Sequence, residues 1–196
     1  MKKKIHIIGG VLDGCELAYQ LSLNKIFTHI YEMRPKVTTD AHQTGHLSEL
    51  VCSNSFRSDD SVYNAVGLLH EELRLSNSLI MEAADKNRVP AGSALAVDRD
   101  MFSKYIDTKI KSNKYIKVIN KEITSLKIFN DDIVVIATGP LTTKKLSEEI
   151  EKITSKKSLD FFDAIAPIVY YESIDMNIAW KQSRYDKGDG DDYINC

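Results

Sequence analysis

The pattern of apolar and polar positions changes period several times along the chain and predicts a mixed α/β fold. Short runs rich in β-branched residues are typical of strands, whereas apolar residues three or four positions apart are typical of helices. The first 35 residues have the order strand, glycine turn, helix and strand of a βαβ unit. We expect strands at 4–8, 28–33, 94–98, 116–123, 131–140 and 164–171, and helices at 15–25, 62–86, 99–111 and 142–153.

Two stretches of this pattern allow more specific structural predictions. The run DDIVVIATGP at 131–140 is continuously apolar after its two acidic residues, which is typical of a strand buried on both faces of a parallel sheet. Residues 36–61 contain many Thr, Ser, Asp and His and show no clear period. They predict a long, partly ordered loop, and loops of that length are often functional.

Composition and charge narrow the function classes. With a formal net charge of −2 on 196 residues, the chain has no general attraction for nucleic acid or anionic lipid. Its three cysteines, Cys15, Cys52 and Cys196, include no C-x-x-C pair and fit neither a disulfide framework nor a zinc site. No run approaches the roughly 20 apolar residues of a membrane-spanning helix, so we expect a soluble, cytoplasmic protein.

The stretch IIGGVLDGCE at 7–16 is similar to a dinucleotide-binding turn. In G-x-G-x-x-G the first glycine makes the turn, the second lets the backbone approach a pyrophosphate, and the third allows close helix packing. Those positions hold Gly9, Val11 and Gly14, and Asp13 adds a negative charge near the helix N-terminus. The stretch is either a Rossmann-type turn altered at its most cofactor-specific position or a glycine turn that only joins a strand to a helix.

Two further positions favour the nucleotide interpretation. Glu32 lies at the end of the second expected strand, where a carboxylate commonly accepts hydrogen bonds from ribose hydroxyls. Thr138 and Gly139 end the expected strand at 131–140 and would bring backbone to the same crevice. Taken alone, these two residues are explained equally well by a core strand followed by a turn, but together with Gly9, Gly14 and Glu32 they favour the nucleotide interpretation.

Three other groups of residues suggest different chemistry. Cys52 has Arg57 close in sequence, and a nearby cation favours the nucleophilic thiolate; the alternative is a small, partly buried residue. His42 and His46 have the i, i+4 spacing of a metal-ligand pair, but no third ligand stands in a recognised pattern, so we expect no metal site. The stretch DKGDGDD at 186–192 is similar to a calcium loop only in composition and predicts a solvated loop.

Several longer stretches resemble consecutive signatures of the folate-dependent tRNA uracil-5 methyltransferases. They are YEMRP, ELVCSNSFRSDD, NAVGLLHEELRLSNSLIMEAADKNRVPAGSALAVDRDMFS, VVIATGPL, APIV and SRYDKGD, and the resemblance runs nearly the whole length of the chain. More distant relatives are the flavoproteins that install carboxymethylaminomethyl groups on tRNA wobble uridines, which share the FAD fold but not LVCSNSFRSDD. The turn of the methyltransferases is like G-A-G-L-A-G, and this chain departs from it at Val11 and Asp13.

The resemblance implies a cytoplasmic flavoprotein that acts on tRNA. Such an enzyme takes a one-carbon unit from methylenetetrahydrofolate, reduces it with FAD and NAD(P)H, and places it on C5 of the T-loop uridine. The resemblance also implies that Cys52 is a catalytic cysteine. It implies a cofactor-binding set at the adenosine and diphosphate end of FAD, made of Gly9, Gly10, Val11, Leu12, Asp13, Gly14, Glu32, Arg34, Thr138 and Gly139.

Together these inferences predict an α/β fold in which residues 1–196 form an incomplete, Rossmann-like FAD-binding domain. Part of an inserted substrate domain is expected at roughly 90–130 and after 155. Family members are more than twice as long, so we expect a truncated fold with an exposed sheet edge. Such a chain is expected to be inactive alone or to pair with a separately encoded C-terminal half. The alternatives are a non-enzymatic remnant that binds tRNA or protein, and a fragment of another FAD-dependent tRNA-modifying flavoprotein.

Overall fold

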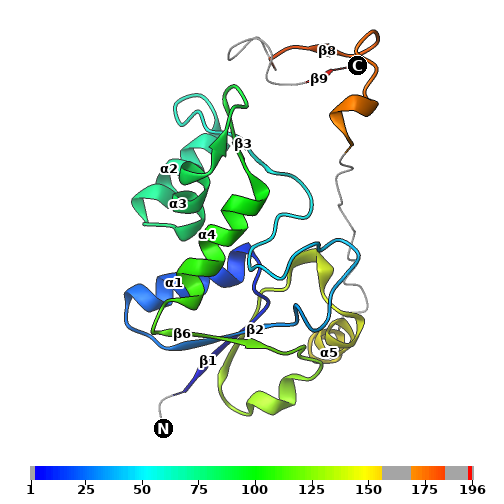
Figure 1. Cartoon of the computed structure of the whole chain (residues 1–196). Coiled ribbons are helices and arrows are strands. Elements are labelled where there is room, and N and C mark those ends of the chain that lie inside the picture. The colour runs from blue at the N-terminus through cyan, green and yellow to red at the C-terminus, as the bar shows by residue number, and fades with distance from the viewer. Residues whose placement is uncertain (1–2, 156–168, 184–193, 196) are drawn as a thin grey trace. The chain divides into compact units, whose positions relative to one another are not determined.

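The computed structural model of the chain describes residues 3–155, 169–183 and 194–195 (Figure 1). The chain divides into two compact units, unit 1 of residues 1–51 and 103–164 and unit 2 of residues 52–102 and 165–196. The inserted domain expected at roughly 90–130 and after 155 stays a prediction. A compact unit shows which residues pack together, and it does not show whether a segment was inserted into another domain.

Unit 1 is built on a four-stranded parallel sheet in the order β6-β2-β1-β7. Ile7 in β1 stands opposite Ile30 in β2 and Val135 in β7. Because the strand order reverses beside β1, the carboxyl ends of β1 and β7 border the crevice in which doubly wound sheets bind ligands. The strands are β1 (Ile5–Ile8), β2 (Thr28–Glu32), β6 (Ile116–Asn120) and β7 (Ile133–Ile136).

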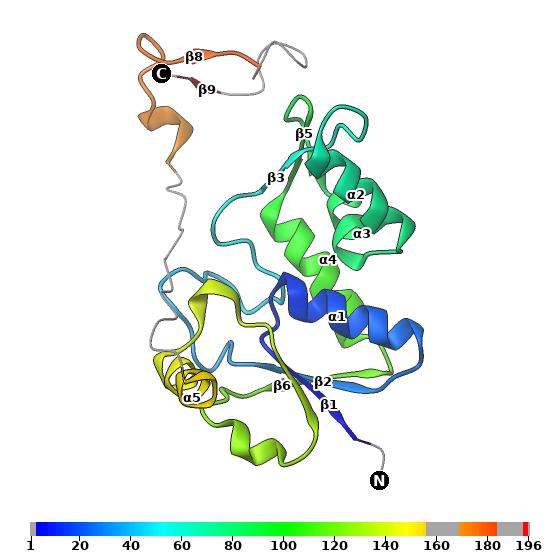
Figure 2. The same ribbon diagram turned by 180° about the vertical axis from the view of Figure 1, so that it is seen from behind.

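Other elements pack on both faces of this sheet. Figures 1 and 2 show α1 (Leu12–Leu23) and α4 (Arg99–Lys111) on one side and the 3₁₀ turn η1 (Leu126–Phe129) on the other. The side chains of Ile7 and Ile30 are completely buried. Helix α5 (Lys144–Thr154) contributes Leu146 to a second core cluster, whose other buried members are Ile8, Ile123 and Phe129.

Two glycines permit the close packing around β1. Gly9 has a φ of +105°, and a Cβ on this residue would lie 2.2 Å from the carbonyl oxygen of Ala137. A Cβ on Gly14 would lie 2.1 Å from the carbonyl oxygen of Gly9. The first and last glycines of the turn are therefore required by the packing of unit 1 itself.

Unit 2 contains an antiparallel sheet in the order β3-β5-β4, together with two helices. Its core includes the completely buried side chains of Leu79, Leu95, Val97 and Phe102. The elements are β3 (Ser55–Ser58), α2 (Ala65–Leu75), α3 (Leu79–Lys86), β4 (Arg88–Val89) and β5 (Ala94–Val97).

The Asp59 carboxylate forms ion pairs and hydrogen bonds with residues of several of these elements. It pairs with His70 Nδ1 at 3.0 Å and accepts hydrogen bonds from Arg74 Nη2 at 2.9 Å and from Arg88 Nη2. Burial would raise the pKa of Asp59, but these three partners outweigh it and lower the pKa. The carboxylate thus stays ionised and links β3, α2 and β4.

Most of the expected elements are present, with boundaries that shift by a few residues. The structure confirms the strands expected at 4–8, 28–33, 94–98 and 116–123 and the helices expected at 15–25, 99–111 and 142–153.

The single helix expected at 62–86 is wrong, because α2 and α3 are separate helices. Asn77 between them has a φ of +56°, which an α-helix does not allow. The Ser78 side chain accepts a hydrogen bond from the Met81 N–H and so caps the start of α3. The apolar period continues across this break, and the pattern alone therefore did not reveal it.

Two other expectations need correction. Part of the loop expected at 36–61 is a strand, β3, because Ser55 and Ser58 pair with Ala96 and Ala94 of β5. The strand expected to be buried on both faces, β7, has Ile133 46% and Ile136 37% exposed. Among the described strands β7 pairs only with β1.

The C-terminal stretches are only partly described. Of the strand expected at 164–171, residues 164–168 lie outside the described residues, as does the acidic loop at 186–192. Tyr171 instead begins the 3₁₀ turn η3 (Tyr171–Ser173), and β8 (Trp180–Lys181) pairs with β9 (Ile194–Asn195). Within the described ranges, no helix has the length and apolar character needed to cross a membrane.

We expect Gly14→Ala to destabilise unit 1, because the added methyl group would collide with the Gly9 carbonyl oxygen and press on Ile7. Overpacking of this kind costs about 1–3 kcal/mol, which urea denaturation would measure as a loss in the free energy of unfolding. Gly45→Ala is the matched control, because a Cβ there lies 3.5 Å from Pro35 Cβ, an ordinary contact. Equal losses in the two variants would contradict this account.

Candidate functional site

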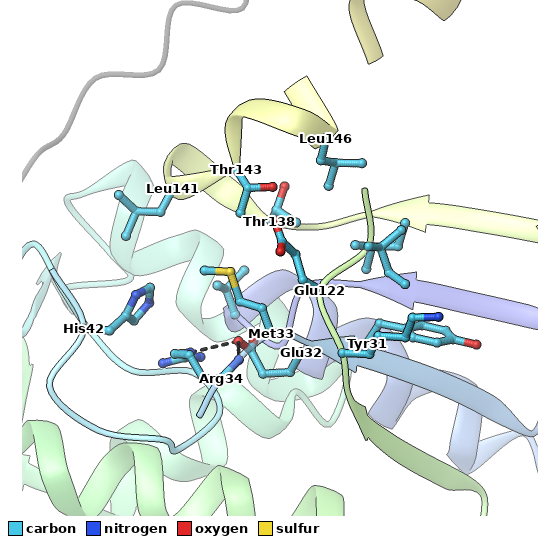
Figure 3. A pocket seen from close by; sticks show the side chains of 15 residues that line it. Tyr31, Glu32, Met33, Arg34, His42, Glu122, Thr138, Leu141, Thr143 and Leu146 are labelled. Carbon is cyan, nitrogen blue, oxygen red and sulfur yellow. Dashed lines mark hydrogen bonds and ion pairs between the residues drawn. The ribbon is translucent and has the colours of Figure 1, made fainter. Parts of the chain in front are cut away.

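A pocket of about 460 Å³, including its open mouth, lies at the carboxyl ends of the parallel strands of unit 1 (Figure 3). Its walls come from the ends of β1, β2 and β7, from residues 121–123 after β6, and from the start of α5. Of the residues expected to bind a cofactor, Gly9, Val11, Glu32, Arg34 and Thr138 line it.

The Glu32 carboxylate is the centre of this site. The residue is 4% exposed. One oxygen, Oε2, accepts a hydrogen bond of 2.9 Å from the Gly10 N–H. The other, Oε1, accepts hydrogen bonds from the Arg34 N–H at 3.0 Å and from Arg34 Nε at 2.9 Å. The carboxylate therefore joins the end of β2 to the turn after β1.

The Arg34 side chain extends this network into the following loop. Its guanidinium group is almost completely buried and donates from Nη1 to Glu49 at 3.0 Å. Glu49 in turn accepts hydrogen bonds from Gln43 and Thr44. The remaining nitrogen, Arg34 Nη2, is buried and has no hydrogen-bond partner among the described residues. Arg34 thus holds residues 43–49 against the end of β2, and its Nη2 donor is not used within the described residues.

Two titratable groups of the pocket have shifted pKa values. Burial would raise the pKa of Glu32, but the ion pair with Arg34 and the N–H groups of Arg34 and Gly10 outweigh it and lower the pKa. Burial lowers the pKa of His42, and the Arg34 charge lowers it further. At pH 7 the pocket therefore contains an ionised Glu32 and a neutral His42.

The turn between β1 and α1 holds the two altered positions. Val11 is the N-cap of α1 with φ −82° and ψ −173°, an extended conformation that any residue adopts. A Cβ built on Gly139 would lie 4.0 Å from Val11 Cγ2. The Val11 side chain therefore lies beside Gly139, which begins the 3₁₀ turn η2 (Gly139–Leu141) that follows β7. Asp13 is exposed in the first turn of α1.

The other expected cofactor residues do not line the pocket. Gly10 donates a hydrogen bond to Glu32, and Glu32 lines the pocket. Leu12 and Gly14 lie in the first turn of α1 beside Asp13. Their assignment to FAD stays a prediction.

The two described cysteines differ in environment. Cys52 is exposed, and its carbonyl oxygen accepts a hydrogen bond from Arg99 Nη2 at 3.2 Å. Cys15 is buried in α1, and burial raises the pKa of its thiol to about 12. Only Cys52 is placed to react with a molecule from solvent.

The histidine pair does not converge on one point. His42 Nδ1 lies 2.7 Å from Thr39 Oγ1, whereas His46 Nδ1 lies 3.6 Å from Asp107 Oδ2. Within the part of the chain that the structure describes, no three His, Cys, Asp or Glu side chains gather to hold a metal ion.

The sequence pattern missed three residues of the site. Ile123 follows β6, and the rule that ligands bind at carboxyl ends of strands would have pointed to it. Thr143 is the N-cap of α5, and its buried hydroxyl has no partner among the described residues. Glu49 gave no signal, because its role depends on how residues 36–61 fold back onto Arg34.

We expect Glu32→Gln to lower the free energy of unfolding by about 2 kcal/mol at pH 7, because hydrogen bonds to a charged group are lost. The folded carboxyl has a pKa below its ordinary value of 4.5. Ionised Glu32 therefore stabilises the fold above about pH 4.5, and this contribution disappears as the pH falls through the lower folded value.

Urea denaturation at pH 7, 5 and 3.5 would measure this difference between the chain and the variant, which should shrink below pH 4.5. Glu122→Gln serves as the control, because Glu122 lines the same pocket and is only half-buried. A difference that is unchanged at pH 3.5 would count against the stabilising role of ionised Glu32.

The chain is similar to known proteins over nearly its whole length. The chain matches the family model described as glucose inhibited division protein A over residues 4–196. It is 56% identical over 196 residues to the methylenetetrahydrofolate–tRNA-(uracil-5-)-methyltransferase TrmFO of Bartonella henselae, covering 98% of this chain and 42% of that protein. Identity to the protein of the same name from Paramagnetospirillum magneticum is 54%, covering 100% of this chain and 44% of that protein.

Solved structures support the fold. GidA of Aquifex aeolicus is similar with a TM-score of 0.55 and 12% identity in one crystal form, over 71% of this chain and 26% of that protein. In a second crystal form the TM-score is 0.53. The Rossmann-like α/β fold and the resemblance to the tRNA uracil-5 methyltransferases are thus confirmed, although the chain spans less than half the length of these curated relatives. By its match over residues 4–196, the chain belongs to the glucose inhibited division protein A family.

Proposed function

We propose that this chain is the N-terminal portion of a flavin- and folate-dependent tRNA methyltransferase. The longer enzyme would form 5-methyluridine in the tRNA T-loop from methylenetetrahydrofolate, with FAD and NAD(P)H, in the cytoplasm. The observation that carries the proposal is the identity of 52–56%, over nearly the whole chain, to relatives named for this reaction. The chain spans 42–45% of those two relatives, so the activity is proposed for the longer protein.

The residues present fit one half of FAD and not the other. A carboxylate offers about four acceptor positions, and Glu32 uses three of them, so one is left for a ribose hydroxyl. Val11 stands where the fingerprint leaves backbone open to a pyrophosphate, and Asp13 places a carboxylate at the helix N-terminus. The diphosphate half does not fit this turn, and we therefore propose that the chain is inactive by itself.

Cys52 is the proposed catalytic cysteine of the longer enzyme. C5 of uracil becomes nucleophilic when a thiolate adds to C6, so the reaction needs an accessible thiol. Cys52 has an exposed side chain, which supports this role.

A chimaeric enzyme would test the proposal. Residues 1–196 replace the corresponding part of the Bartonella henselae protein, and the turn carries Val11→Gly and Asp13→Ala. Given tRNA lacking the modification, methylenetetrahydrofolate, FAD and NADPH, we expect mass spectrometry of the nucleosides to detect 5-methyluridine. The chimaera with the native turn should form it at least about tenfold more slowly, because the loss of oriented binding costs at least that factor.

Two cysteine variants of the repaired chimaera would separate catalysis from folding. Cys52→Ala should abolish methylation, whereas Cys15→Ala, at a buried thiol, should retain it. A repaired chimaera that is folded and binds FAD but leaves tRNA unmethylated would refute the proposed function.

A second candidate function is a non-enzymatic binding module. Val11 and Asp13 favour it, because selection for cofactor binding would remove both residues. This candidate requires the purified 196-residue chain to form a stable complex with tRNA or with the C-terminal half of a relative. Sedimentation velocity would show such a complex, and a chain that sediments alone in both mixtures would exclude this candidate.

A further inference from the structure

The segment that carries Cys52 is held at two points by the junction between β5 and α4, and all of these residues belong to unit 2. Asn54 donates from Nδ2 to the Val97 carbonyl oxygen at 2.9 Å, and its own carbonyl oxygen accepts from the Val97 N–H at 3.0 Å. Arg99 donates from Nη2 to the Cys52 carbonyl oxygen at 3.2 Å. The backbone of residues 52–54 therefore rests on this junction.

The junction is a firm support. The side chains of Val97 and Phe102 are completely buried. Asp98 stands before α4, where its Oδ1 accepts a hydrogen bond of 2.9 Å from the Met101 N–H and its N–H donates to the Asn87 carbonyl oxygen at 2.9 Å. Arg99 is the first residue of α4, so its backbone is fixed by these contacts on either side.

The contact between Arg99 and Cys52 restrains one peptide group. The Cys52 carbonyl and the Ser53 N–H belong to the same planar group, so a donor bound to the carbonyl oxygen restrains both. Rotation about the Cα–C bond of Cys52 is thereby limited, and with it the direction in which the thiol points. Arg99 lies 47 positions from Cys52 in the chain, and no local sequence pattern relates the two residues.

We propose that Arg99 is a positioning residue for Cys52. Its guanidinium holds the backbone of the cysteine, so that the exposed thiol keeps a fixed orientation toward the substrate. A misplacement of about 1 Å in a reacting group can cost a factor of about 10² in rate. This inference rests on the proposed role of Cys52 in the longer enzyme.

Nitrogen-15 relaxation of the 196-residue chain would measure this restraint through the order parameter of the Ser53 N–H. We expect about 0.85 in the native chain, the value of rigid backbone, and less than about 0.6 in Arg99→Ala, because the peptide group is then released. Arg99→Lys keeps a charged donor and should restore the native value. Arg57→Ala is the matched control, because it removes an exposed arginine of β3 near Cys52 in the sequence and should leave the order parameter unchanged.

The repaired chimaera would measure the consequence for methylation. Arg99→Ala should lower kcat at least about tenfold and leave KM for tRNA unchanged within about twofold, because a misdirected thiol slows the chemical step and not the binding of tRNA. Arg99→Lys should recover most of the lost kcat. Each variant is compared with its parent by circular dichroism, so that a loss of folding is recognised.

Two results would overturn the proposal. One is a Ser53 order parameter that is equal in the native chain and in a folded Arg99→Ala variant. The other is an Arg99→Ala chimaera that methylates tRNA as fast as its parent. A folded parent chimaera that binds FAD and leaves tRNA unmethylated refutes the proposed function instead, and the Ser53 order parameter then still decides whether Arg99 orients Cys52.

Discussion

The buried Glu32 carboxylate is the interaction on which the rest of the site depends. It receives the Gly10 N–H from the turn after β1 and the guanidinium of Arg34 at the end of β2. Arg34 then holds Glu49, and Glu49 holds the backbone of residues 43 and 44. One ionised group thus joins two strand ends and a long loop, and its charge is tolerated in the interior because every donor around it lowers its pKa.

The glycine turn separates the requirements of folding from those of ligand binding. Gly9 and Gly14 are required by packing, because a Cβ on either would collide with a backbone carbonyl oxygen. The middle position is different, since Val11 has extended dihedral angles that any residue adopts. Valine there adopts an unstrained backbone conformation but, as the N-cap of α1, gives the helix no side-chain cap. The packing glycines typical of a dinucleotide turn are therefore present together with a valine at its middle position.

The sequence pattern failed at three places, for different physical reasons. Apolar residues keep their helical spacing from 62 to 86, across the break at Asn77. This spacing shows which face of a helix is apolar, and it does not show whether the backbone stays helical. Ser55 and Ser58 belong to a strand only because β5 pairs with them. The run at 131–140 has the composition of a central strand, yet Ile133 and Ile136 of β7 are partly exposed.

The sequence by itself determined the βαβ core, the position of the glycine turn and the carboxylate at the end of β2. Each of these depends on residues that are neighbours in the chain, whose spacing sets the local period and the turn. The tertiary structure alone decided that Glu32 is held by Gly10 and Arg34, that Val11 lies beside Gly139, and that Thr143 lines the pocket. These contacts follow from the order of the strands in the sheet, and that order brings together side chains that no local pattern relates.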